Sequence, residues 1–132
     1  MSKELYWLTL TAILTGVLWV PYILDRVAVR GLLPAMGNHS PADKPQSTWA
    51  KRLMAAHTNA VEGLVVFAPL VLVAQQTGAT SATTATACAV VFWTRLAHAV
   101  VYTAGVPVAR TFIWTAGWLA QAAIALAIFK LI

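Results

Sequence analysis

Four long apolar segments alternate with shorter polar connections along the chain. They cover about residues 5–24, 50–75, 82–102 and 111–131. A helix needs about 20 predominantly apolar residues to cross the hydrocarbon core of a bilayer. The pattern therefore predicts an all-α integral membrane protein, in which residues 1–132 form a single domain built as a four-transmembrane-helix bundle.

The first segment is expected to be retained as a membrane span. Its apolar run is too long for a signal peptide, and the sequence around Pro21 does not resemble a cleavage site. Pro21, followed by Asp25, is expected to end this first helix. The connection over residues 25–49 is rich in glycine and proline, so it is expected to be irregular or partly extended. Pro69 is expected to bend the second span.

Composition and charge support the membrane assignment. Hydrophobic residues make up 60% of the chain and charged residues 10%, whereas a soluble domain carries roughly 25% charged residues. The net charge of +5 does not indicate nucleic-acid binding, because the basic residues form no stripe with interleaved aromatics. They gather between residues 26 and 52, and the connection after the second span carries no charge. The positive-inside rule therefore places the 25–49 loop in the cytoplasm and both termini outside.

Metal and disulfide chemistry is not expected. Cys88 is the only cysteine, so the chain can form neither an intrachain disulfide nor a cysteine-based metal site. His39, His57 and His98 do not have the spacing of metal ligands. The sequence also lacks a glycine-rich phosphate loop and a Ser–His–Asp arrangement. Candidate chemistry is therefore confined to the polar residues inside the spans.

Two spans carry polar residues along one face each. They are Arg52, Asn59 and Glu62 in the second span, and Arg95, His98 and Tyr102 in the third. The residue spacing places the members of each set within about 80° of one another around the helix. The second span starts at the cytoplasmic side and the third ends there. Both polar faces are therefore expected in the cytoplasmic half of the bundle.

Two interpretations of this polar layer are open from sequence alone. In the first, Glu62 pairs with Arg95 and the pair only holds the bundle together, because a carboxylate at membrane depth needs a partner. In the second, the layer binds an anionic ligand, because arginines outnumber acids and a guanidinium suits carboxylates. The arginines concerned are Arg52, Arg95 and Arg110. Tyr102 and Thr111 would add hydroxyl donors at the same level.

The order of the motifs resembles that of a known family. The motifs are Arg52-Leu-x-x-Ala-His57-x-Asn59-x-x-Glu62, Phe67-Ala-Pro69-Leu, Arg95-x-x-His98-x-x-x-Tyr102 and Pro107-x-x-Arg110. Over essentially its whole length the chain resembles the MAPEG family, the membrane-associated proteins of eicosanoid and glutathione metabolism. Its closest likeness is to the branch of microsomal glutathione transferases and prostaglandin E synthases, in a compact bacterial form.

This resemblance implies a homotrimer in a bacterial inner membrane, with glutathione bound between subunits on the cytoplasmic side. It implies glutathione-binding roles for Arg52, Asn59, Glu62, Arg95, His98 and Tyr102, and catalytic roles for Arg110 and Thr111. Arg110 would stabilise the glutathione thiolate while the Thr111 hydroxyl donates to the sulfur. The implied reaction is conjugation of glutathione to lipophilic electrophiles, reduction of lipid hydroperoxides, or both. The substrate would enter from the lipid between the first and fourth spans, and no metal is involved.

The chain departs from the prostaglandin synthase branch at three positions. Ala55 and Thr58 stand where that branch has arginines, and Trp114 stands where it has a tyrosine. A prostaglandin substrate is therefore not expected, and a non-catalytic family member is an alternative. A small four-span transporter that uses Glu62 is another, although the nearby arginines would repel cations. Trp114 and Trp118 share a helix face, either as interface anchors or as the wall of a substrate groove.

Overall fold

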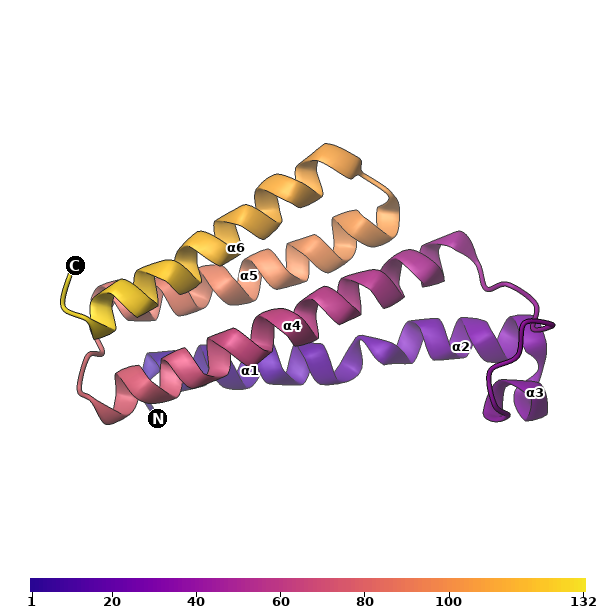
Figure 1. The fold of residues 1–132 in the computed structure, drawn as a ribbon, viewed down its shortest axis with the longest axis horizontal. Coiled ribbons are helices and arrows are strands. Elements are labelled where there is room, and N and C mark those ends of the chain that lie inside the picture. The colour runs from indigo at the N-terminus through magenta and orange to yellow at the C-terminus, as the bar shows by residue number, and fades with distance from the viewer.

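The computed structural model covers residues 1–132 and consists of helices and their connections. The helices are α1 (Lys3–Val17), α2 (Trp19–Arg30), α3 (Leu32–Met36), α4 (Thr48–Gln76), α5 (Ala82–Ala104) and α6 (Pro107–Ile128). Four stretches are long and apolar enough to cross a membrane, namely Lys3–Arg30, Thr48–Gln76, Ala82–Ala104 and Pro107–Ile128. The predicted all-α membrane protein with four spanning helices is therefore confirmed (Figure 1).

The prediction that Pro21 ends the first helix is wrong. The chain has a break at Leu18, after which α2 runs through Pro21 to Arg30. Pro21 falls in the first turn of α2, where a backbone N–H needs no intrahelical partner, so proline is tolerated there. Gly31 ends α2 with a φ of 83°, and its N–H donates to the carbonyl of Val27 at 2.9 Å. A positive φ favours glycine at this position.

The loop predicted over residues 25–49 is accordingly shorter and partly helical. Its first residues belong to α2 and the short helix α3 follows, so that only Gly31 and residues 37–47 lack helical structure. The carboxylate of Asp25 accepts hydrogen bonds from both the backbone N–H and the hydroxyl of Ser47, at 3.1 and 2.5 Å. This contact fixes the start of α4 against α2.

The other helix boundaries lie within a few residues of the predicted ones. Helix α4 continues through Pro69, whose side chain is exposed on the helix surface. Helix α6 begins at Pro107, four residues before the predicted start of the fourth span, because proline at the first helical position has a suitable φ. The turn before it contains Gly105, which ends α5 with a φ of 82°.

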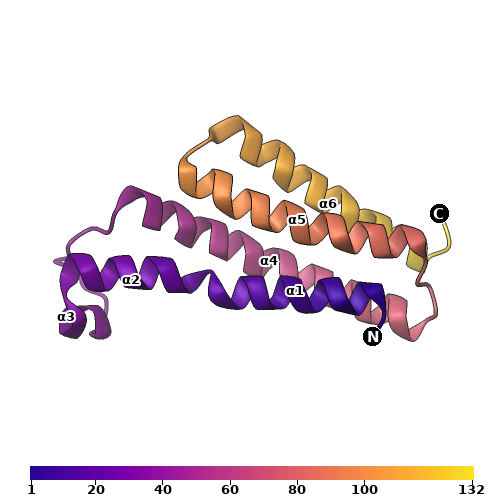
Figure 2. The ribbon, with the colours of Figure 1, turned by 180° about the vertical axis from the view of Figure 1, so that it is seen from behind.

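Helix α5 is the centre of the bundle and packs against α1, α4 and α6. Helices α1 and α6 lie at opposite sides of the bundle and make no extensive contact with each other (Figures 1 and 2). Both termini and the α4–α5 connection lie at one end of the bundle. The α5–α6 turn, α3 and the loop before α4 lie at the other end.

An apolar core fills the half of the bundle near the termini, and we call it the packed half. Its buried residues are Phe67, Val71, Ala74, Ala87, Cys88, Val91, Ala120 and Ile124. Polar contacts close the same end, since the Thr84 hydroxyl donates to the buried Glu4 carboxylate at 2.7 Å. Ser2 donates to Gln75 at the same distance. The functional candidates lie in the other half.

Candidate functional site

A polar pocket opens between α4, α5 and α6 in the half of the bundle away from the termini. It has a volume of about 250 Å³, and its lining residues are Asn59, His98, Tyr102, Arg110, Thr111 and Trp114. We call these six residues the polar pocket. Five of them are predicted site residues that come from three different helices. The structure therefore brings together residues that lie up to 52 positions apart in the sequence.

The turn between α5 and α6 sets the position of Arg110 and Thr111. Gly105 and Pro107 reverse the chain, so that both residues fall in the first two turns of α6. The N-terminus of a helix carries partial positive charge and favours anions. The site therefore combines a guanidinium, a hydroxyl and a helix N-terminus at one place.

Aromatic contacts hold the basic group of the pocket in place. The Cζ atom of Arg110 lies 4.3 Å from the ring centroid of Tyr102. The rings of His98 and Tyr102 meet edge to face, with centroids 5.5 Å apart. Arg110 has no carboxylate partner, because both ion pairs of the protomer involve Asp43 in the loop before α4. The pocket thus presents an uncompensated positive charge.

Arg95 lies beside the pocket and does not line it. Only 5% of its surface is exposed, and its Nε and Nη1 atoms have no hydrogen-bond partner. Its guanidinium packs where two glycines let the helices come close. A Cβ atom added to Gly63 would lie 3.1 Å from Cζ of Arg95, and one on Gly117 would lie 2.6 Å from Oγ1 of Thr94.

Arg52 and Glu62 also lie outside the polar pocket. Arg52 packs against the α5–α6 turn, since a Cβ atom on Gly105 would lie only 2.5 Å from its Nη1. Glu62 is exposed on the outer surface of α4 and forms no ion pair. The interpretation that Glu62 pairs with Arg95 does not hold within one protomer. Arg95 is buried, Glu62 is exposed, and neither has a charged partner.

Sequence reasoning did not identify the close contacts at Gly63, Gly105 and Gly117. It also left two interpretations of Trp114 open. Trp114 follows Arg110 and Thr111 by four and three residues, so helical spacing places it on their face. Trp114 lines the wall of the polar pocket, which is not the apolar substrate groove of the second interpretation. The close contacts of Gly63 and Gly117 depend on how α4, α5 and α6 pack, and no local pattern reports that.

No cluster of three or more His, Cys, Asp or Glu residues is placed to hold a metal ion.

The chain matches the model of a known protein family. Neither the curated proteins nor the solved structures contain a significant match to the chain. The model of the MAPEG family matches residues 5–130, which is nearly the whole chain. This match, with the four spanning helices, shows that the chain is an integral membrane protein of the MAPEG family.

Proposed function

We propose that this protein is a glutathione-dependent membrane enzyme. It conjugates glutathione to lipophilic electrophiles, reduces lipid hydroperoxides, or does both. The observation that carries the proposal is the polar pocket, where Arg110 has no carboxylate partner and lies among hydroxyl, amide and imidazole groups. Glutathione carries two carboxylates, an ammonium group and a thiol that must ionise, and these are groups that such a pocket suits.

Each pocket residue has a role in this proposal. Arg110 stabilises the thiolate, because nearby positive charge lowers the pKa of a thiol. The Thr111 hydroxyl donates to the sulfur. Asn59, His98 and Tyr102 bind the peptide and carboxylate groups of glutathione. Three further residues lie outside the pocket lining. Arg52 and Arg95 add positive charge near the pocket, and Glu62 binds the ammonium group of glutathione.

A site completed by a neighbouring subunit accounts for the residues that one protomer leaves apart. The pocket volume of about 250 Å³ is below the roughly 300–1,000 Å³ of most small-molecule sites. Glu62 is an exposed carboxylate on a spanning helix, and such groups normally face protein or water. A homotrimer with glutathione between subunits would cover Glu62. It would also bring α1 of one subunit beside α6 of the next, where a lipophilic substrate can enter.

The chemistry needs no metal or bound cofactor. In conjugation, the thiolate sulfur forms a bond to an electrophilic carbon, and the leaving group departs with its electron pair. In peroxide reduction, two glutathione molecules are oxidised to the disulfide while the hydroperoxide becomes an alcohol and water. Trp114, exposed at the pocket wall, offers an apolar surface for the second substrate. We place the pocket on the cytoplasmic side, where the basic loop is expected to lie.

The test is a matched pair of variants on adjacent residues of α4. Asn59 lines the pocket, whereas the hydroxyl of Thr58 donates to the carbonyl of Met54 on the exposed surface. Glutathione binding to detergent-purified protein is measured by isothermal titration calorimetry for wild type, Asn59→Ala and Thr58→Ala. We expect wild type and Thr58→Ala to bind alike, and Asn59→Ala to bind several-fold more weakly. Wild type that does not bind at millimolar glutathione removes the basis of the proposal.

A proton-coupled carrier is the second candidate, and the exposed carboxylate of Glu62 is the observation that favours it. Such a carrier would move a substrate across vesicle membranes in response to a pH gradient and without glutathione. Loss of that transport in Glu62→Gln, in a protein that does not bind glutathione, would support this candidate over the enzyme.

A further inference from the structure

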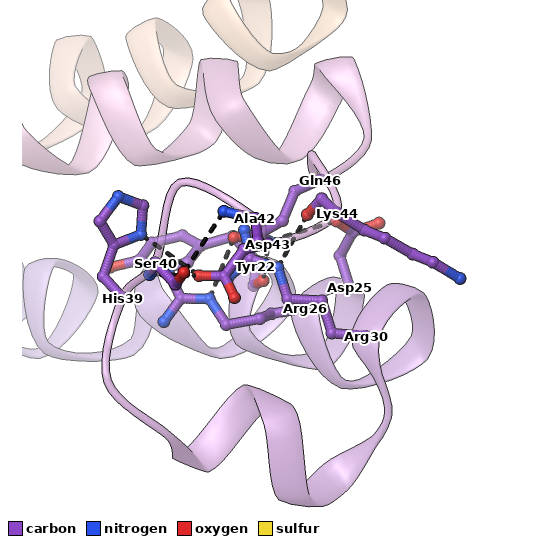
Figure 3. A network of polar contacts seen from close by, with 10 residues as sticks. All are labelled: Tyr22, Asp25, Arg26, Arg30, His39, Ser40, Ala42, Asp43, Lys44 and Gln46. Carbon is purple, nitrogen blue, oxygen red and sulfur yellow. Dashed lines mark hydrogen bonds and ion pairs between the residues drawn. The ribbon is translucent and has the colours of Figure 1, made fainter.

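A second cavity lies between α2 and the loop before α4, at the end of the bundle away from the termini. Its volume is about 260 Å³, and its polar lining comes from Arg26, Arg30, His39, Asp43 and Gln46. Figure 3 shows these side chains converging from α2 and from the loop. None of them lines the polar pocket. The proposed glutathione chemistry gives this cavity no role.

Hydrogen bonds orient both arginines of this cavity through their Nε atoms. Arg26 Nε donates to Oε1 of Gln46 at 3.0 Å, and Arg30 Nε donates to the carbonyl of Lys44 at 2.8 Å. Gln46, which is 7% exposed, is itself fixed because its amide donates to the carbonyl of Tyr22 at 2.7 Å. With Nε engaged, the Nη end of Arg26 is left for another partner, whereas Nη1 of Arg30 lies 3.7 Å from Oδ2 of Asp43.

Of the two acidic residues nearby, only Asp43 pairs with one of these arginines. Asp25 accepts its hydrogen bonds from Ser47 and Gln46. Asp43 accepts one from the backbone N–H of Ser40 at 2.9 Å, and it is also shared by Arg30 at 3.7 Å and His39 at 3.4 Å. Arg26 has no acidic partner.

Two like charges four residues apart on a helix repel each other. Arg26 and Arg30 have this spacing on α2, and only Asp43 offsets them inside the cavity. The cavity therefore has a net positive charge that an anion would neutralise. Arginine binds phosphate through two parallel N–H bonds. This fits the Arg26 guanidinium, which is held by Nε and has its Nη end free, while Arg30 adds a second positive charge beside it.

The surroundings of this cavity have the composition of a membrane interface. The short helix α3 follows α2 directly, and it exposes Leu32, Leu33 and Met36 by 62%, 79% and 73% of their surface. Exposed apolar residues beside a basic cavity, at the end of a spanning helix, are typical of the membrane interface. We propose that this cavity binds a phosphate group, carried by an anionic phospholipid or by a soluble phosphate ester, through Arg26 and Arg30.

The test separates the two sources of phosphate. Native mass spectrometry counts the molecules of phosphatidylglycerol or phosphatidylcholine retained by detergent-purified protein, and calorimetry measures binding of glycerol 1-phosphate in the absence of lipid. Arg26→Gln is the main variant. Its control is Lys44→Gln, which removes one positive charge from the neighbouring loop before α4. The Lys44 side chain points away from the network (Figure 3). We expect roughly tenfold weaker binding for Arg26→Gln and no change for Lys44→Gln.

A second variant protects the test against misfolding of Arg26→Gln. Ala35 lines the cavity, so Ala35→Leu fills it while keeping both arginines and their Nε bonds, and it should weaken binding as well. Retention of phosphatidylglycerol identifies a lipid as the source, and binding of glycerol 1-phosphate identifies a soluble ester. Absence of both, equal losses in Lys44→Gln, or displacement of the phosphate ligand by glutathione would overturn the proposal. Since glutathione binding is scored separately, this result does not depend on the enzyme proposal.

Discussion

Helices α4, α5 and α6 run through two halves of the bundle that differ in how well their polar groups are satisfied. In the packed half, Phe67, Val71 and Ile124 are fully buried, and the buried Glu4 carboxylate accepts a hydrogen bond from Thr84. Around the polar pocket, Arg95 has two nitrogen atoms without partners, and Arg110 faces no acid.

The difference supports assigning stability to the packed half and the proposed chemistry to the half around the polar pocket, which we call the polar half. A buried polar group without a partner costs free energy, so a fold keeps it where something else compensates. The packed half has no buried side-chain N or O atom without a hydrogen-bond partner, since even the Glu4 carboxylate accepts a hydrogen bond from Thr84. The polar half keeps Arg95 and Arg110 uncompensated, as expected of a site whose partner is a ligand. Mutations in the two halves should therefore affect different measurements.

The largest effect is expected from opening a cavity in the packed half. Phe67 is 0% exposed, and removing a buried phenylalanine side chain typically costs about 3–5 kcal/mol of unfolding free energy. Phe67→Ala should therefore lower thermal stability strongly while leaving glutathione affinity per folded molecule unchanged. The control is Phe112→Ala, because Phe112 is 72% exposed. Equal stability of the two variants would contradict the assignment of the packed half as the core.

The second-largest effect is expected on the reaction rate, from a substitution in the polar half. Arg110→Ala removes the charge assigned to the thiolate, and loss of one group that stabilises developing charge typically costs roughly 100-fold in rate. The pH–rate profile should also move to higher pH, because the thiol loses its neighbouring cation. Conjugation of a lipophilic electrophile, measured by absorbance, gives both quantities. Arg110→Lys keeps the charge and should retain part of the rate. Unfolding that accompanies the loss would instead indicate a structural role.

The sequence was sufficient for the fold because apolar length alone reports a membrane span. It was less reliable at Pro21, where the position of proline in the first turn of α2 decides whether a helix ends or continues. For the site, helical spacing grouped His98 with Tyr102 correctly, and both line the pocket. It also grouped Arg95 with them, but burial beside Gly63 separates Arg95 from the pocket. That separation depends on helix packing, which local spacing does not contain.

A smaller effect is expected at the boundary between the halves. A Cβ atom on Gly117 would lie 2.6 Å from Thr94 Oγ1 and 3.4 Å from Arg95 Nη2, so Gly117→Ala forces α5 and α6 apart. Overpacking of this kind typically costs about 1–3 kcal/mol. Gly16→Ala is the matched control, since nothing lies within 4 Å of its Cβ position in the structure. We expect only Gly117→Ala to lower the melting temperature and to weaken glutathione binding together. If both variants behave alike, the close approach of α5 and α6 has no energetic importance.

The smallest effect tests whether a neighbouring subunit completes the polar half. Glu62 is exposed in the protomer and makes no ion pair, so Glu62→Gln should not change the stability of the isolated subunit. If Glu62 binds the ammonium group of glutathione across a subunit interface, the variant should bind about tenfold more weakly, equivalent to about 1.4 kcal/mol. Glu62→Asp keeps the carboxylate and should lose less. Calorimetry, with native mass spectrometry of the oligomer, separates the outcomes. A trimer of the Glu62→Gln variant that binds glutathione as tightly as wild type would show that Glu62 does not bind the ammonium group, and that the polar half does not depend on this carboxylate.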